Sequence, residues 1–145
     1  MIEPVTHYDE QLIASIRSLL GQLTQQTIIF GEQELRGLLA NDASHLFIMR
    51  EQEEVVGMLT LATYLSPTGR KAWVEDVVVD SAYRSRGYGR ALISHAIRYC
   101  EETLSPCTLM LTSNPQREAA NALYRTSGFE QKITNVYKLN CPDNE

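Results

Sequence analysis

The residues of greatest chemical interest form one short stretch, YRSRGYGR at positions 83–90, which we call the arginine turn. Glycine lets a backbone come close to a phosphate group, and arginine neutralises the charge of that group. Residues 81–100 contain no acid, although the whole chain carries a formal net charge of −5. This contrast favours an anion-binding turn over the alternative, a solvated helix face. The candidate cofactor-binding residues here are Arg84, Ser85, Arg86, Gly87, Tyr88, Gly89 and Arg90.

Two elements must hold the arginine turn in place. The segment Trp73 to Asp80, which precedes it, contains a run of valines that is too short and too β-branched for a helix. We expect a strand buried on both faces. After the turn, apolar residues recur at helical spacing and predict a helix from about Tyr88 to about Thr103. The unpaired N–H groups of the first helical turn would then point at the anion.

Apolar periodicity predicts further strands and helices along the chain. The expected strands are Ile2–His7, His45–Arg50, Val55–Tyr64, Cys107–Thr112 and Ile133–Leu139. The other expected helices begin near Asp9, which can cap its helix, or span Glu32–Ala40 and Gln116–Thr126. Antiparallel strands come first and a strand–helix–strand half comes last. We therefore expect an α/β (α+β) fold with a mixed sheet and helices on both faces. A length of 145 residues predicts a single domain, residues 1–145.

Composition argues against several classes of function. Contacts with nucleic acid need a broad basic face, so we expect no nucleic-acid partner for this acidic chain. The cysteines Cys100, Cys107 and Cys141 form no metal-binding motif, which predicts neither a metal site nor a disulfide framework. The chain has no apolar run of about eighteen residues, and its N-terminus is neither basic nor apolar. We therefore expect no membrane span, no signal peptide and a cytoplasmic location.

Two motifs resemble the GNAT superfamily of acetyl-CoA-dependent N-acyltransferases. The first is Arg84-x-x-Gly87-x-Gly89 after a Val-Val-Val-Asp strand. The second is the segment 114–129, which resembles the later helix of the family because Tyr124 is followed four and five residues on by Gly-Phe. The resemblance covers residues 73–139. It implies the GNAT fold, a mostly antiparallel mixed sheet of about six or seven strands with about four helices, and acetyl-CoA as cosubstrate.

The resemblance also implies roles around the cofactor. Acetyl-CoA would enter where the sheet splays, and backbone groups of Val77, Val78 and Val79 would pair with its pantetheine arm. Tyr124 matches the family's tyrosine that points at the thioester sulfur, which makes it the candidate acid; an ordinary packing aromatic is the alternative. Two roles are open for Asn121, on the same helix face: a hydrogen bond to the cofactor or a cap of the helix.

Two adjacent acids, Glu75 and Asp76, stand inside the valine-rich strand. Strand alternation puts them on opposite faces, so they do not share one environment. Glu75 is the candidate base, acting through water, because a carboxylate in a low-dielectric cleft has a raised pKa; a structural carboxylate is the alternative. The sequence VEDVVVD resembles the small glucosamine-phosphate N-acetyltransferases, in which these acids help shape the substrate cleft.

The residues and the resemblance together predict an N-acetyltransferase that moves an acetyl group from acetyl-CoA to a primary amine of a small molecule by direct transfer. A protein or peptide N-acetyltransferase and a non-catalytic acyl-CoA-binding regulatory module are the alternatives. Motif spacing does not identify the acceptor amine. The segment Ile133–Leu139 would leave an exposed strand edge in a monomer, which predicts a homodimer.

Overall fold

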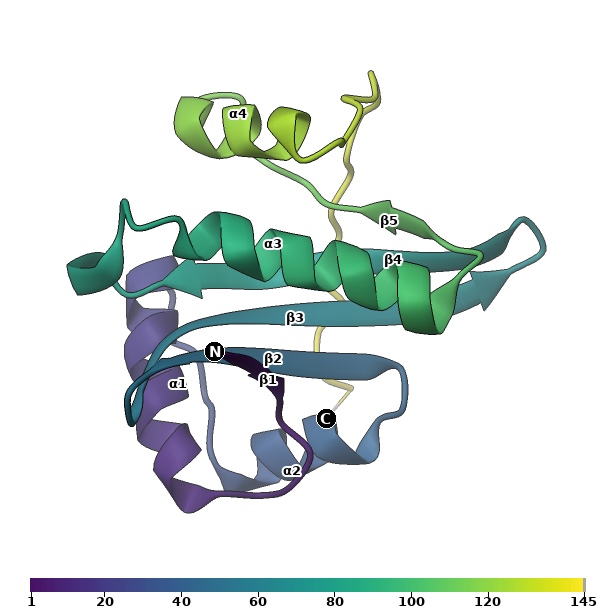
Figure 1. Ribbon diagram of the computed structural model, residues 1–145. Helices are drawn as coiled ribbons and strands as arrows, with labels where there is room; N and C mark the ends of the chain where they lie inside the picture. Colours follow the sequence, from purple (N-terminus) through teal and green to yellow (C-terminus); the bar gives the residue numbers. More distant parts are fainter. Residues whose placement is uncertain (145) are drawn as a thin grey trace. The chain divides into compact units, whose positions relative to one another are not determined.

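A five-stranded sheet is the centre of the first of two units of the chain, Met1–Ser113 (Figure 1). The computed structural model describes residues 1–144. The strands follow one another in sequence order: β1 (Ile2–Pro4), β2 (Ser44–Glu51), β3 (Glu54–Ser66), β4 (Gly69–Val79) and β5 (Thr108–Met110). Neighbours are antiparallel except β4 and β5, which are parallel. The expected mixed, mostly antiparallel sheet is confirmed, although the described residues form five strands rather than six or seven.

Four α-helices accompany the sheet in the described residues, three in the first unit and one in the second, Asn114–Glu145. They are α1 (Glu10–Leu23), α2 (Glu32–Ala40), α3 (Tyr88–Tyr99) and α4 (Glu118–Thr126). The Asp9 carboxylate accepts a hydrogen bond from the Gln11 N–H at 2.9 Å and caps α1 as predicted. The helix predicted to reach Thr103 ends as a π-helical turn, Cys100–Leu104. No helix within residues 1–144 is long and apolar enough to cross a bilayer.

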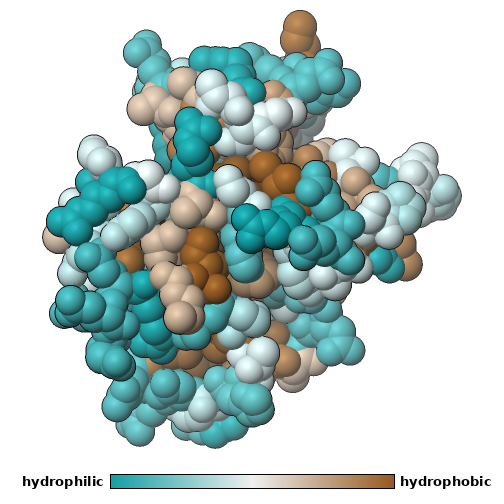
Figure 2. All heavy atoms as spheres, viewed as in Figure 1, coloured by the Kyte–Doolittle hydropathy of each residue, from teal (hydrophilic) through white to brown (hydrophobic). Residues whose placement is uncertain are grey.

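Apolar side chains pack against both faces of the sheet. On one face, Ile48, Met58 and Val78 belong to a buried cluster with residues of α1 and α2. On the other face, the ring of Phe47 packs edge-on against His95 of α3, with ring centroids 4.8 Å apart. Hydrophilic residues cover most of the face seen in Figure 2. The predicted arrangement, helices on both faces of the sheet, is therefore confirmed.

A β-bulge interrupts β4 just before the arginine turn. The register against β3 shifts between Glu75 and Val78, so that Asp76 and Val77 lie opposite one residue of β3. Asp76 takes a left-handed backbone conformation with φ 51°. Simple alternation therefore fails at the pair Glu75–Asp76. The prediction of a strand buried on both faces is also wrong, because Val77 and Val79 are only half-buried.

The second unit contains α4 and a C-terminal segment. The predicted last strand, Ile133–Leu139, is wrong: these residues form neither strand nor helix and are exposed. Their apolar positions are Ile133, Val136, Tyr137 and Leu139, which do not follow the period of two that defines one buried face of a strand. The strand edge on which the expected dimer depended is thus not present in this segment.

Candidate functional site

The arginine turn lies between the end of β4 and the first turn of α3, as predicted. Gly87 is the N-cap of α3 and has φ 80°, a left-handed conformation that favours glycine. No described side chain caps the helix there. Where a Gly87 Cβ would stand, no described atom beyond the chain neighbours lies within 4 Å. The first N–H groups of α3 and the open space beside them therefore fit a phosphate group.

The glycines and the serine of the arginine turn differ in backbone conformation. Ser85 is also left-handed, with φ 63°, whereas Gly89 lies inside the first turn of α3. Backbone freedom is therefore needed at Gly87. The helical backbone at Gly89 does not by itself require glycine.

Arg84 and Arg86 of the turn both have partners within the chain. Arg84 Nε donates a hydrogen bond to the Val79 carbonyl at 3.3 Å. Arg86 Nη1 lies 3.6 Å from a carboxylate oxygen of Glu51, and its guanidinium carbon lies 5.0 Å from the centre of the Tyr83 ring. The Arg86–Glu51 pair is partly exposed, and such pairs contribute about 0–1 kcal/mol. A ligand with several negative charges would therefore compete successfully for Arg86.

The strand that leads into the arginine turn has an edge available for pairing. In the described chain, β5 pairs with β4 only at Lys71–Trp73. In the later part of β4, Val78 and Val79 pair with β3 on the other edge, and Val77 lies in the bulge. β5 therefore uses no backbone group of this later part. Apart from the Val79 carbonyl, which accepts from Arg84, the groups on this edge are left available to an extended ligand.

Glu75, the candidate base, stands opposite Thr60 of β3. Partial burial raises the pKa of Glu75 above the ordinary carboxyl value, and the charge of Asp76 raises it further. Both acids keep contact with solvent, because both residues are exposed. The predicted direction of the pKa shift is confirmed, while the catalytic role of Glu75 stays a prediction.

The other predicted site residues, Asn121 and Tyr124, lie on α4 in the second unit. Asn121 Nδ2 donates a hydrogen bond to the Asn114 carbonyl at 3.0 Å and so holds the loop before α4. The Tyr124 ring packs edge-on against Phe129, with centroids 6.1 Å apart. The contact of Tyr124 agrees with the packing alternative, whereas Asn121 lies inside α4, whose N-cap is Arg117, and does not cap the helix. Their roles toward the cofactor stay predictions, and the structure gathers only the arginine turn and the end of β4 into one unit.

Two carboxylates that sequence analysis does not single out contact the arginine turn. Glu51 accepts a short hydrogen bond from the Tyr88 hydroxyl, and Glu54 accepts one from the Tyr83 hydroxyl at 3.0 Å. The partners are 37 and 29 residues apart in sequence, respectively. No local pattern predicts such pairs. The signal that points to them is the charge contrast between EQEE at 51–54 and the acid-free arginine turn.

Residues 1–144 contain no group of three or more His, Cys, Asp or Glu side chains able to hold a metal ion. Cys100 is buried, and burial together with the neighbouring Cys107 raises its pKa to about 12. That thiol is protonated at neutral pH and is a poor nucleophile.

Comparison with known proteins identifies the class to which this fold and site belong. The model of the Acetyltransferase (GNAT) family matches residues 13–129, so the chain belongs to this acetyltransferase family, whose acyl donor is acetyl-CoA. A relative is the uncharacterized N-acetyltransferase YhfO of Bacillus subtilis (strain 168). It is 30% identical over 114 residues, which are 77% of this chain and 76% of YhfO.

Solved structures share the fold. A putative acetyltransferase from Agrobacterium tumefaciens str. C58 has a TM-score of 0.81 at 24% identity, covering 97% of this chain and 99% of that one. The structure of AAC(6')-Iy in complex with the bisubstrate analogue CoA-S-monomethyl-acetylneamine has a TM-score of 0.76 at 17% identity, covering 97% and 98%. The GNAT fold expected from the two motifs is therefore confirmed.

Proposed function

We propose that the chain is an N-acetyltransferase that moves an acetyl group from acetyl-CoA directly to a primary amine of a small molecule. The observation that carries the proposal is the cradle at the start of α3, where Gly87 leaves the helix without a side-chain cap. The pyrophosphate of CoA would bind the N–H groups of the first helical turn. Arg84, Arg86 and Arg90 would surround it with positive charge.

The pantetheine arm would lie along the end of β4. Its amide groups are spaced for hydrogen bonds with an extended backbone, as in the addition of a strand to a sheet. Val77, Val78 and Val79 lead straight from the bulge into the arginine turn, so an arm paired with them would carry the pyrophosphate to α3. The edge of β4 that β5 leaves unused supports this placement.

The transfer forms one bond and breaks another. The neutral amine nitrogen attacks the thioester carbonyl carbon, the new C–N bond forms, and the C–S bond breaks with CoA leaving as a thiolate. Tyr124 would protonate the sulfur, and Glu75 would accept the proton of the amine through water. The raised pKa of Glu75 supports its role, because it brings the carboxyl nearer to neutrality. Asn121 would hydrogen-bond the cofactor.

The acceptor proposed is a small amine. A phosphorylated amine would need a second cationic site, and the basic residues outside the turn include Arg36 and Arg50. Arg36 pairs with Glu32 at 2.9 Å and Arg50 pairs with Glu3 at 2.8 Å, and a charged ligand would compete for them as for Arg86. Amino sugar phosphates are therefore tested beside unphosphorylated amines. The AAC(6')-Iy complex, in which CoA is joined to an acetylneamine, supports a fold that takes CoA and a small amine together.

An amine panel tests the proposed function. Purified protein and acetyl-CoA are mixed with aminoglycosides, amino sugars, amino sugar phosphates, amino acids and short peptides, and free CoA thiol is followed. We expect release with a small amine and a mass increase of one acetyl group on that amine. Transfer to peptides alone would favour the protein-directed alternative. Binding of acetyl-CoA without transfer to any amine would favour the regulatory module.

We also propose that the protein is a homodimer, on a different basis from the strand edge first expected. The exposed apolar residues of the C-terminal segment include Ile133 and Leu139, with exposed fractions of 103% and 88%. Several large apolar side chains exposed in one short segment favour association with a second surface.

A further inference from the structure

The hairpin turn Glu51-Gln52-Glu53-Glu54 between β2 and β3, here called the acidic turn, contacts the arginine turn. Glu51 and Glu54 stand opposite each other in the strand register, where like charges repel. Each carboxylate accepts a hydrogen bond from a tyrosine hydroxyl of the arginine turn. Glu51 accepts from Tyr88, and Glu54 accepts from Tyr83 at 3.0 Å. Two glutamates that repel each other across the hairpin do not stabilise the hairpin itself. Their hydrogen bonds to the two tyrosines indicate that they act on the arginine turn.

The two tyrosines mark the two ends of the segment that must be shaped for an anion. Tyr83 ends the 3₁₀ turn Ser81–Tyr83, and Tyr88 is the first residue of α3. Between them the backbone is left-handed twice, at Ser85 with φ 63° and at Gly87 with φ 80°. Gly87 adopts this conformation readily, whereas at Ser85 it costs free energy and persists only where the surroundings hold it. The hydrogen bonds to the acidic turn fix both ends of this segment.

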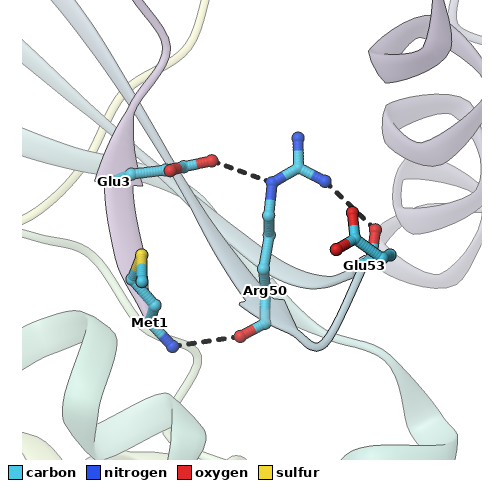
Figure 3. A network of polar contacts seen from close by, with 4 residues as sticks. All are labelled: Met1, Glu3, Arg50 and Glu53. Atoms are coloured by element: carbon cyan, nitrogen blue, oxygen red, sulfur yellow. Dashed lines mark hydrogen bonds and ion pairs between the residues drawn. The ribbon is translucent and has the colours of Figure 1, made fainter.

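A network of polar contacts holds the acidic turn itself (Figure 3). Arg50 Nε donates to the Glu3 carboxylate at 2.8 Å, and Arg50 Nη1 donates to the Glu53 carbonyl at 3.1 Å. The N-terminal ammonium of Met1 donates to the Arg50 carbonyl at 3.0 Å. These contacts tie the acidic turn to β1. The arginine turn is therefore attached to the acidic turn, and the acidic turn is in addition held to β1.

The charge state of the tyrosines suits this task. Hydrogen bonds to Glu54 and Glu51 raise the pKa of Tyr83 and of Tyr88 above the ordinary phenol value. Both hydroxyls thus stay protonated through the neutral range and remain donors. Arg86 adds a weaker link, because it lies 3.6 Å from Glu51.

We propose that Glu51 and Glu54 are positioning residues for the cofactor, and that through Tyr88 and Tyr83 they hold the arginine turn in the conformation that receives the phosphates of CoA. The inference rests on the proposed function. A preformed cradle binds more tightly, because the ligand does not have to order it. Loss of the bracing therefore weakens CoA binding and raises KM for acetyl-CoA, while kcat at saturation stays unchanged.

A matched pair of variants at position 51 separates hydrogen bonding from charge. Glu51→Gln and Glu51→Ala both remove the negative charge beside Arg86, but only glutamine keeps an oxygen that accepts from the Tyr88 hydroxyl. Calorimetric titration with CoA measures each dissociation constant. We expect Glu51→Ala to bind CoA about three- to tenfold more weakly than Glu51→Gln, the worth of one hydrogen bond. Glu54→Ala against Glu54→Gln repeats the comparison at Tyr83.

The same comparison in a Tyr88→Phe background completes the test. The phenyl ring stays but donates nothing, so the difference between alanine and glutamine at position 51 should vanish. Tyr99→Phe, at the other end of α3, is the control and should leave CoA binding unchanged. Equal affinities of Glu51→Ala and Glu51→Gln, or a difference that persists in the Tyr88→Phe background, would overturn the inference. A wild-type protein without affinity for CoA would instead refute the proposed function.

Discussion

Gly87→Ala tests the conformation on which the cradle depends. Gly87 has φ 80°, and a Cβ there meets no described atom within 4 Å, so crowding does not enter. A side chain in left-handed backbone costs roughly 1–2 kcal/mol. For a chain of this size, that free energy lowers Tm by roughly 2–8 °C. Movement of the backbone to relieve the strain would also turn N–H groups of α3 away from the anion, so CoA affinity should fall.

Gly37→Ala is the matched control. Gly37 lies inside α2, and a Cβ there also meets no described atom within 4 Å. Its backbone is helical, so alanine should stabilise the fold by roughly 0.5–1 kcal/mol. Urea unfolding followed by circular dichroism gives both free energies of unfolding, and calorimetry gives CoA affinity. The reasoning is refuted if Gly87→Ala is as stable as wild type and binds CoA equally well.

Three further predictions concern the acid, the base and the assembly. The folded-state pKa of Glu75 is raised, so this group favours the folded state at low pH and loses that contribution as pH rises through its folded pKa. Glu75→Gln should therefore raise Tm at about pH 8 but not at about pH 4, and should flatten the acidic limb of kcat/KM. Asp76→Asn is the control, because asparagine tolerates the left-handed backbone at φ 51°. It should keep the acidic limb but move it to lower pH, because the charge that raises the pKa of Glu75 is gone. Tyr124→Phe should lower kcat about 10²-fold with stability kept and KM for acetyl-CoA within about threefold; unchanged turnover with a lower Tm would make Tyr124 a packing residue. Sedimentation should give the mass of a dimer, and a monomeric mass at working concentration would contradict the proposed assembly.

Local signals in the sequence are sufficient for much of the fold. The apolar spacing and the breaks around it predict α2 at Glu32–Ala40, which are its bounds in the structure. Asp9 caps α1 as expected, because the side chain and the N–H that it binds are two residues apart. The start of α3 at Gly87 is predictable in the same way, because the left-handed conformation of a glycine depends only on the adjacent backbone.

Features that depend on residues distant in the sequence cannot be predicted from local sequence signals. The bulge at Asp76 arises from the register of β4 against β3, and its left-handed residue is an aspartate rather than the glycine that would announce it. The hydrogen bonds from Tyr83 and Tyr88 reach carboxylates on another hairpin. The predicted strand Ile133–Leu139 did not form, because a strand needs a paired neighbour and the apolar positions of this segment do not mark one buried face.

Calorimetric titration of CoA into wild type and Gly89→Val tests the central claim, the phosphate cradle, most directly. Gly89 lies in the first turn of α3, where a helical backbone accepts valine, and the branched side chain would stand where the pyrophosphate binds in the proposed cradle. Gly21→Val in α1, where a Cβ also meets no described atom within 4 Å, is the control for valine in a helix. We expect wild type and Gly21→Val to bind CoA, more weakly as salt rises, and folded Gly89→Val to give no binding heat. Equal affinity of Gly89→Val and wild type would contradict the cradle.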